Sequence, residues 1–151
     1  MRLQLQSQSS LSPEQVVAAL TDFSERRPQM WTGITPDHYH VYSVEGSSAD
    51  VREGTKRGGL NVWAVEHYDW SSPNRVTWTV KESNFCTPGS YVRADISPRP
   101  GGGSIIQTTW DRTPTTLQGR IVFGVMKLSR GKAVESSMRR GLANYEREMA
   151  G

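Results

Sequence analysis

Apolar and polar residues follow two different periods along this chain. From Ser129 to the end, apolar residues recur at three- and four-residue steps, which places them on one face of an α-helix. These residues are Val134, Met138, Gly141, Leu142, Tyr145 and Met149. Between Tyr39 and Thr113, apolar residues alternate with polar ones, as in strands with one buried face. The pattern predicts a long C-terminal helix whose apolar stripe packs on one face of a sheet.

Ahead of the sheet, the sequence predicts a strand and a first helix. Residues 2–8 alternate leucine with glutamine, which is typical of a strand with one solvated face. A helix start follows, with Ser12 as its cap, Pro13 at the first helical position and Gln15 three residues after the cap. We expect this helix to end near Asp22.

A second short helix is expected to begin at Ser24 and to break at Pro28, with the segment closing at Trp31. Six strands joined by short turns then predict an antiparallel meander. The expected strands are 38–45, 49–55, 60–70, 75–83, 87–97 and 104–113. The densely apolar stretch 116–128 is interpreted as a helical or bent segment over the mouth of the sheet.

Together these elements predict an α+β fold. A curved antiparallel sheet of about seven strands would wrap around the long C-terminal helix, with two short helices after the first strand. The chain has 151 residues, of which 35% are hydrophobic and 22% charged, enough for one folded domain over residues 1–151. Bulky Met and Tyr residues in the terminal stripe suggest that the helix does not pack flush on the sheet, which leaves room for a cavity.

The composition narrows the function classes. The net charge is +3 and the sequence pI near 9.2, but Lys and Arg are scattered in short clusters without a nucleic-acid-binding motif. No nucleic-acid partner is therefore expected. The single cysteine, Cys86, excludes an internal disulfide and fits a reducing, cytoplasmic location. No apolar run is long enough for a secretion signal or a membrane span.

The sequence motifs give little support for a metal site, a cofactor site or a catalytic site. His38 and His40 are two apart in an expected strand, beside Asp37, and His67 could join them in a metal site. The chain has no cysteine cluster and no HExxH, so no metal is expected. It also has no GxSxG, no phosphate-binding loop and no GxGxxG, so we expect no cofactor, and the motifs identify no catalytic residue.

Aromatic residues are frequent in the expected strands, where they serve either as core or as the wall of a cavity. We interpret part of this set as a cavity wall beneath the long helix. The predicted ligand-binding residues are Trp31, Tyr42, Trp63, Trp78, Tyr91, Trp110, Met126, Met138, Leu142 and Tyr145. Their facing is inferred from alternation alone, and a register error of one residue would invert the set of a whole strand.

The order of elements and several motifs resemble the START/polyketide-cyclase superfamily (SRPBCC), whose members have the helix-grip fold. The similarity spans nearly the whole chain. It is carried by residues 12–16, 20–22 and Trp31, by 63–69 with Pro73 and 76–78, and by 142–146. The resemblance implies that lipids, sterols, polyketides or similar molecules bind between the sheet and the long helix. Some members, the aromatase/cyclases, guide cyclisation and dehydration of a polyketide chain, so the resemblance also implies this activity as an alternative.

Three functions stay open on the sequence. The leading hypothesis is a carrier of a hydrophobic or aromatic small molecule. The second is a polyketide cyclase or dehydratase, whose apolar cavity would shift the pKa of a proton donor or acceptor. The candidates for that role are Glu66, His67, Arg93 and Asp95. The third is an interaction protein whose cavity is filled by Trp and Met and whose basic helix face docks a partner. The oligomeric state also stays open, with a homodimer as one alternative.

Overall fold

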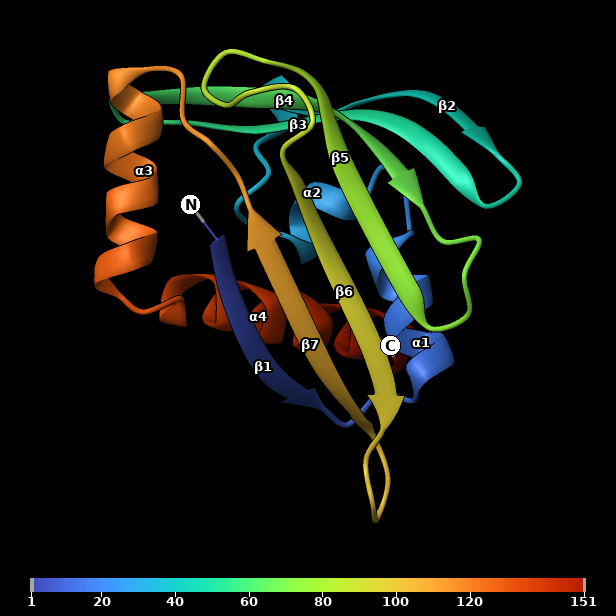
Figure 1. Ribbon diagram of the computed structural model, residues 1–151. Helices are drawn as coiled ribbons and strands as arrows, with labels where there is room; N and C mark the ends of the chain where they lie inside the picture. Colours follow the sequence, from blue (N-terminus) through green and yellow to red (C-terminus); the bar gives the residue numbers. More distant parts are fainter. Residues whose placement is uncertain (1, 151) are drawn as a thin grey trace.

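The structure, a computed structural model, describes residues 2–150, which form one seven-stranded sheet and four α-helices (Figure 1). The strands are β1 (Arg2–Ser9), β2 (His40–Glu45), β3 (Ser48–Arg57), β4 (Leu60–Asp69), β5 (Arg75–Ser83), β6 (Tyr91–Pro98) and β7 (Ser104–Asp111). The helices are α1 (Pro13–Leu20), α2 (Arg27–Met30), α3 (Leu117–Leu128) and α4 (Lys132–Ala150), with a 3-10 turn at Pro36–His38.

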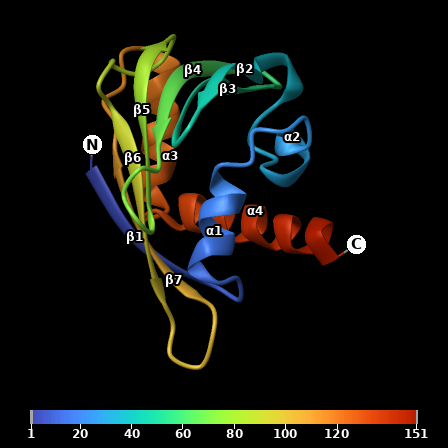
Figure 2. The same ribbon diagram turned by 90° about the vertical axis from the view of Figure 1, so that its right-hand side faces the viewer.

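The strands are ordered β1-β7-β6-β5-β4-β3-β2 across the sheet, and every neighbouring pair is antiparallel. Strands β2 to β7 follow one another as a meander, and β1 pairs with β7. The sheet curves around α4, with α1 and α2 on the same side (Figure 2). The predicted helix-grip fold is therefore confirmed, including the two short helices after the first strand.

The first two helices differ from each other in how well the sequence predicted them. Ser12 caps α1: its Oγ accepts the Gln15 N–H at 3.3 Å, and the Gln15 side chain accepts the Ser12 N–H at 2.9 Å. Helix α2 begins at Arg27, so the prediction that Pro28 breaks a helix was wrong. Pro28 lies in the first turn, where amide groups have no partner within the helix and a missing N–H costs little.

Residues 116–128 form the helix α3 and its cap, the helical one of the two predicted alternatives. Thr116 Oγ1 accepts the Gly119 N–H at 3.1 Å and so satisfies one amide of the first turn. Arg130 and Gly131 have φ angles of 53° and 80°, which interrupt the helical path. The terminal helix therefore begins at Lys132, within the stretch from Ser129 that was predicted for it.

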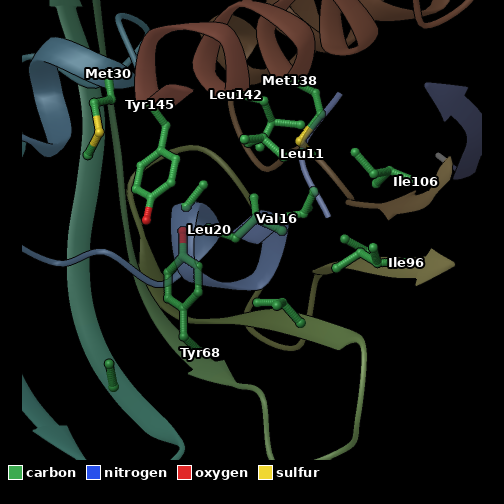
Figure 3. Close-up of a cluster of buried hydrophobic side chains, with 14 of the residues drawn as sticks. Leu11, Val16, Leu20, Met30, Tyr68, Ile96, Ile106, Met138, Leu142 and Tyr145 are labelled. Atoms are coloured by element: carbon green, nitrogen blue, oxygen red, sulfur yellow. The ribbon is translucent and has the colours of Figure 1, made fainter. Parts of the chain in front are cut away.

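The main core lies between α4, α1 and the sheet. In Figure 3, Met138, Leu142 and Tyr145 of α4 point toward α1 and the strands. The other buried members of this cluster are Leu11, Val16, Ala19, Leu20, Met30, Ala49, Val51, Tyr68, Val76, Ala94, Ile96 and Ile106. A second, smaller cluster lies under α3 and comprises Ala64, Val80, Cys86, Val92, Trp110 and Phe123.

Helix α4 approaches the end of α2 closely at Gly141. A Cβ atom at this position would be 2.1 Å from Cε3 of Trp31, so the indole occupies the space that a side chain would need. The Trp31 Nε1–H donates to the Ala19 carbonyl at 3.4 Å, and Asn144 Nδ2 donates to the Met30 carbonyl at 2.8 Å. These contacts join α1, α2 and α4 at one side of the sheet.

Candidate functional site

Two adjoining hollows lie between the curved sheet and the helices α3 and α4, with volumes of about 230 and 270 Å³. The residues that line both are Gly33, Ile34, Glu53, Trp78, Trp110, Arg112 and Met126. The first hollow extends along α4 as far as Met138, and the second extends beneath Phe123 of α3 to Glu66 of β4. Because the hollows share one wall, we treat them as a single two-part cavity.

The structure places five of the ten predicted ligand-binding residues on this cavity. They are Trp31, Trp78, Trp110, Met126 and Met138. Each comes from a different element or connection, so the curvature of the sheet and the path of α3 and α4 bring them together. Trp78 also stacks on Tyr68, with ring centroids 5.4 Å apart and an interplanar angle of 15°. The result is an apolar wall built mainly from indole rings and methionine side chains.

The other five predicted residues do not line the cavity. Leu142 and Tyr145 are buried in the main core beneath α4, where neighbouring side chains fill the space around them. Tyr42 is 52% exposed on β2, the strand at one edge of the sheet. Leu142 and Tyr145 thus contribute to packing, and Tyr42 lies at the surface.

Trp63 and Tyr91 were assigned to the wrong face of the sheet. Along β4 the buried positions alternate so that Val62 and Ala64 face inward, and Trp63 lies on the outer face with the Arg52 guanidinium 4.1 Å from its ring centroid. Along β6 the inward set likewise contains Val92 and excludes Tyr91. The large aromatic rings suggested burial. Successive side chains of a strand point to opposite faces, however, so Trp63 and Tyr91 must point outward when their neighbours Val62, Ala64 and Val92 point inward.

A buried ion pair lies on the cavity wall. Arg112 Nη2 donates to Glu66 Oε1 at 2.5 Å, and the two side chains are only 10% and 5% exposed. Burial raises the pKa of Glu66 above its ordinary value, and the positive charge of Arg112 offsets part of that rise. A carboxyl group and a guanidinium are therefore held together at the edge of an apolar space.

A second buried network lies beside the first, because Tyr68 is two residues from Glu66 on the same face of β4. Arg27 Nε donates to Glu53 Oε2 at 2.5 Å, while Arg27 Nη2 donates to the Tyr68 hydroxyl at 3.1 Å, and that hydroxyl donates to Glu53 Oε1. Arg27 Nη1 also donates to the carbonyl groups of Leu20 and Asp22, at 3.0 Å each. Although burial disfavours its charge, Glu53 and Tyr68 hold the pKa of Arg27 above its ordinary value.

The two networks differ in the chemistry they offer. Four donor contacts tie Arg27 to protein acceptors, which fixes the corner between α1, α2 and β3. Glu66 and Arg112 place one carboxylate and one set of N–H donors beside the second hollow. An oxygen atom of a bound molecule could accept a hydrogen bond there, and a carbon acid could give up a proton.

Of the four residues considered as proton donors or acceptors, only Glu66 lines the cavity. His67 lies on the outer face, with Nδ1 2.8 Å from Asp50 Oδ1. Arg93 and Asp95 also point outward from β6, where their side chains pair at 3.2 Å. The alternatives His67, Arg93 and Asp95 therefore lie outside this cavity, and Glu66 is the candidate that borders it.

The histidines have separate surroundings. His38 Nε2 lies 2.5 Å from Asn61 Oδ1, and the His40 ring packs edge-on against Tyr42 at 4.6 Å between centroids. Within residues 2–150, no group of His, Cys, Asp and Glu side chains could hold a metal ion. In the same part of the chain, no helix is both long and apolar enough to cross a bilayer.

Sequence reasoning missed Arg27, Glu53, Tyr68 and Arg112 as residues of the site. The facing of Tyr68 and Glu66 could have been predicted from the sequence. Both lie an even number of residues from Val62 and Ala64 on the same strand, so all four side chains share one face of the sheet. For Arg27 no comparable signal exists, since its partner Glu53 is 26 residues away on a different element.

With the cavity and its polar groups described, the chain can be compared with known proteins. A family model described as polyketide cyclase / dehydrase and lipid transport matches residues 2–150. The chain belongs to this family. The predicted membership in the START/SRPBCC superfamily is thereby confirmed. No curated protein matches the sequence.

Solved structures share the fold of this family member at low sequence identity. A protein of Thermus thermophilus has a TM-score of 0.78 and 17% identity, over 98% of this chain and 99% of the other. The Zhui aromatase/cyclase of a Streptomyces species has a TM-score of 0.75 and 9% identity, over 99% and 95% of the two chains. A START superfamily protein of Mycobacterium smegmatis has a TM-score of 0.68 and 16% identity, over 91% and 96%. At such identities the likeness shows the fold alone.

Proposed function

We propose that this protein binds a compact apolar or aromatic small molecule in the two-part cavity. The observation that carries the proposal is the wall itself, in which Trp78, Trp110 and Met126 surround a space bordered by the Glu66–Arg112 ion pair. The family description, which includes lipid transport, supports the same class of ligand. The apolar wall would supply most of the affinity and the ion pair would set the orientation of the ligand.

The size of the cavity favours a molecule of one or a few rings over a long lipid chain. Ligand sites commonly have volumes of about 300 to 1,000 Å³, and the two hollows measure about 230 and 270 Å³. Each Å² of apolar ligand surface removed from water contributes about 25 cal/mol. A ligand oxygen beside Arg112 would keep a hydrogen bond that it otherwise loses on leaving water.

Met138→Trp tests this proposal by filling the first hollow from α4. Native mass spectrometry of freshly purified protein is expected to detect a co-purified small molecule in the wild type and none in the variant. Met149→Trp is the matched control, because Met149 lies exposed on the same helix. Retention of the molecule by Met138→Trp, with thermal unfolding unchanged, would place the ligand elsewhere.

A second candidate function is cyclisation or dehydration of a polyketide in the same cavity. The observation that favours it is the buried carboxyl of Glu66, whose pKa is raised, in contact with Arg112. Glu66 would accept a proton from a carbon between two carbonyl groups, and Arg112 would donate a hydrogen bond to the enolate oxygen that forms. That carbon would then attack a second carbonyl of the chain, and loss of water would follow.

Glu66→Gln tests the enzymatic function with a short poly-β-ketone thioester as substrate. The amide keeps the size of the side chain but cannot accept the proton, so turnover to a cyclic product is expected to fall to the background rate. Glu82→Gln on the exposed face of β5 is the control. Undiminished turnover by a folded Glu66→Gln variant would rule out this role of Glu66.

A cytoplasmic location goes with either function. Cys86 is a buried free thiol, which fits a reducing compartment. Fractionation of cells that express the protein, followed by immunodetection, is expected to place it in the cytosolic fraction.

A further inference from the structure

Helix α3 carries apolar side chains on two opposite faces. Phe123 and Met126 turn toward the cavity, where Phe123 packs edge-on against Trp110 with ring centroids 4.7 Å apart. On the outer side, an apolar stripe faces solvent: Leu117, Ile121, Val125 and Leu128 are 74%, 58%, 55% and 87% exposed. Their spacing of four, four and three residues keeps them on one face of the helix. Such a stripe is unusual for the surface of a soluble domain.

The charges that accompany this stripe are all positive. Between Asp111 and Glu135 the sequence contains no acidic residue. The exposed cations of this stretch are Arg120, Lys127, Arg130 and Lys132. Within residues 2–150, none of these four forms an ion pair with a carboxylate.

The geometry of α3 places the four cationic side chains beside the apolar stripe, so that their charged ends could contact a surface on which the stripe rests. At about 100° per residue, Arg120 and Lys127 fall together along one flank, between the exposed stripe and the buried face. Arg130 and Lys132 follow at the turn into α4. The flexible stems of Lys and Arg can lie along an apolar layer while their charged ends remain in water. This arrangement is typical of helices that lie in a membrane interface.

From these observations we propose that α3 docks on the surface of an anionic lipid bilayer. The apolar stripe would enter the boundary between headgroups and acyl chains, and the cations would contact lipid phosphates or carboxylates. Figure 1 shows α3 (orange) at the rim of the molecule, between the ends of β3 and β4 and the start of α4, so a flat surface could reach it. A second copy of the chain fits less well, because a symmetric contact would bring the same four unpaired cations face to face.

Sedimentation with lipid vesicles tests the proposal on the full chain. The wild type is expected to bind vesicles of phosphatidylcholine with phosphatidylglycerol, and to bind vesicles of phosphatidylcholine alone at least about tenfold more weakly. Raising the ionic strength from about 0.1 M to about 1 M should weaken the binding to anionic vesicles, because the Debye length falls to about 3 Å.

Two pairs of substitutions separate the apolar and electrostatic contributions. Ile121→Ser with Val125→Ser removes the centre of the stripe, and Arg120→Gln with Lys127→Gln removes two charges; each pair is expected to weaken anionic-vesicle binding about tenfold or more. Both pairs change exposed side chains, so thermal unfolding should stay near that of the wild type. Val44→Ser, at an exposed apolar residue of β2, is the matched control and should bind as the wild type does.

Any one of four results would overturn the proposal. The first is failure of the wild type to sediment with anionic vesicles, and the second is equal binding to neutral and anionic vesicles. The third is vesicle binding that both pairs of substitutions leave unchanged. If analytical ultracentrifugation instead shows a dimer that Ile121→Ser with Val125→Ser converts to a monomer, without vesicle binding, the stripe is a self-association surface and the membrane proposal is wrong.

Discussion

The space beneath the sheet is built in two different ways at its two ends. On the α4 side, which is formed by the later turns of α4, Leu142 and Tyr145 fit against α1 and the strands in a mainly apolar cluster (Figure 3). On the α3 side, which is formed by α3 and residues 133–138 of α4, the sheet and the helices are separated by hollows, and an ion pair is buried at their wall. Close packing stabilises a fold. Hollows and buried charges do not, since each unfilled volume and each desolvated charge costs free energy.

This contrast indicates that the two sides of the fold have different roles. The α4 side supplies the stability that lets the α3 side keep features which would be unfavourable on their own. It also explains why the residues predicted on α4 separate into two groups. Met138 at the boundary touches the cavity, whereas Leu142 and Tyr145 further along the helix belong to the packed core.

The largest expected effect comes from breaking the buried ion pair on the α3 side. Arg112→Met leaves Glu66 buried without this partner, and we expect the free energy of unfolding to fall by about 3 to 5 kcal/mol. Adding Glu66→Leu should restore most of the loss, because an apolar pair needs no compensating charge. Urea denaturation of the two variants measures both values. If Arg112→Met alone lowers the free energy of unfolding by less than about 1 kcal/mol, the pair is not effectively buried.

Truncation of one apolar residue on each side compares the two kinds of packing directly. Leu142→Ala should lower the free energy of unfolding by about 3 kcal/mol, because the cavity that it creates has fully packed neighbours. Met126→Ala should cost only about 1 kcal/mol, since its side chain already borders a hollow and has fewer contacts to lose. Equal losses in urea denaturation would contradict the contrast between the two sides.

Alkaline pH tests the second buried network, at the junction of the two sides. Burial raises the pKa of Tyr68 well above its ordinary value, with Glu53 adding to the rise, and burial raises the pKa of Tyr39 to about 12. Both pKa values are higher in the folded state, so the unfolded chain loses these protons first. Stability should therefore be intact below about pH 10 and decline above it by about 1.4 kcal/mol per pH unit for the buried Tyr68, with a smaller contribution from the half-buried Tyr39 that ends near pH 12.

Tyr68→Phe removes one phenol from this titration while it preserves the ring that stacks on Trp78. The variant should lose about 1 to 2 kcal/mol at neutral pH, because its hydrogen bonds with Arg27 and Glu53 are gone. Its stability should then decline less steeply above pH 10. Tyr42→Phe on the exposed edge strand is the control for loss of a phenol. An unchanged alkaline slope in Tyr68→Phe would contradict the burial of this hydroxyl.

The smallest expected effect concerns the two faces of the sheet. Trp110→Phe alters the cavity wall and should weaken binding of the co-purified molecule, whereas Trp63→Phe on the outer face should change its affinity by less than about 0.5 kcal/mol. Quenching of tryptophan fluorescence during ligand titration would show the difference. A larger loss in Trp63→Phe than in Trp110→Phe would indicate a ligand on the outer face.

The sequence was sufficient for most of the architecture because the strands and the terminal helix carry a clear period, whereas residues 116–128 left a helix and a bent segment as alternatives. The alternation around Trp78 predicts a strand, and the stripe through Met138 and Leu142 predicts the helix that the sheet encloses. The glycine at position 131 marks the junction before the terminal helix, whereas the positive φ angle at Arg130 leaves no mark in hydrophobic periodicity.

The candidate site was predictable only in part. The interpretation of bulky aromatic residues as cavity wall agrees with the lining positions of Trp78 and Trp110, but it puts Trp63 and Tyr91 on the wrong face. The size of a ring does not show which face of the sheet its side chain is on. The small apolar residues at every second position around Glu66 identify the inner face. The Arg27 network depends on distant segments meeting in space, and a single sequence carries no local pattern for such a contact.

Gly141 gives the protein a simple means of adjusting what it can hold. The Trp31 indole, which is part of the cavity wall, rests where a side chain at position 141 would otherwise be. A methyl group added there would displace the indole, and a shift of this ring would change the shape of the cavity. A substitution at position 141, which does not line the pocket, could therefore change the size of ligand that the protein selects. None of the residues that contact the ligand would need to be substituted.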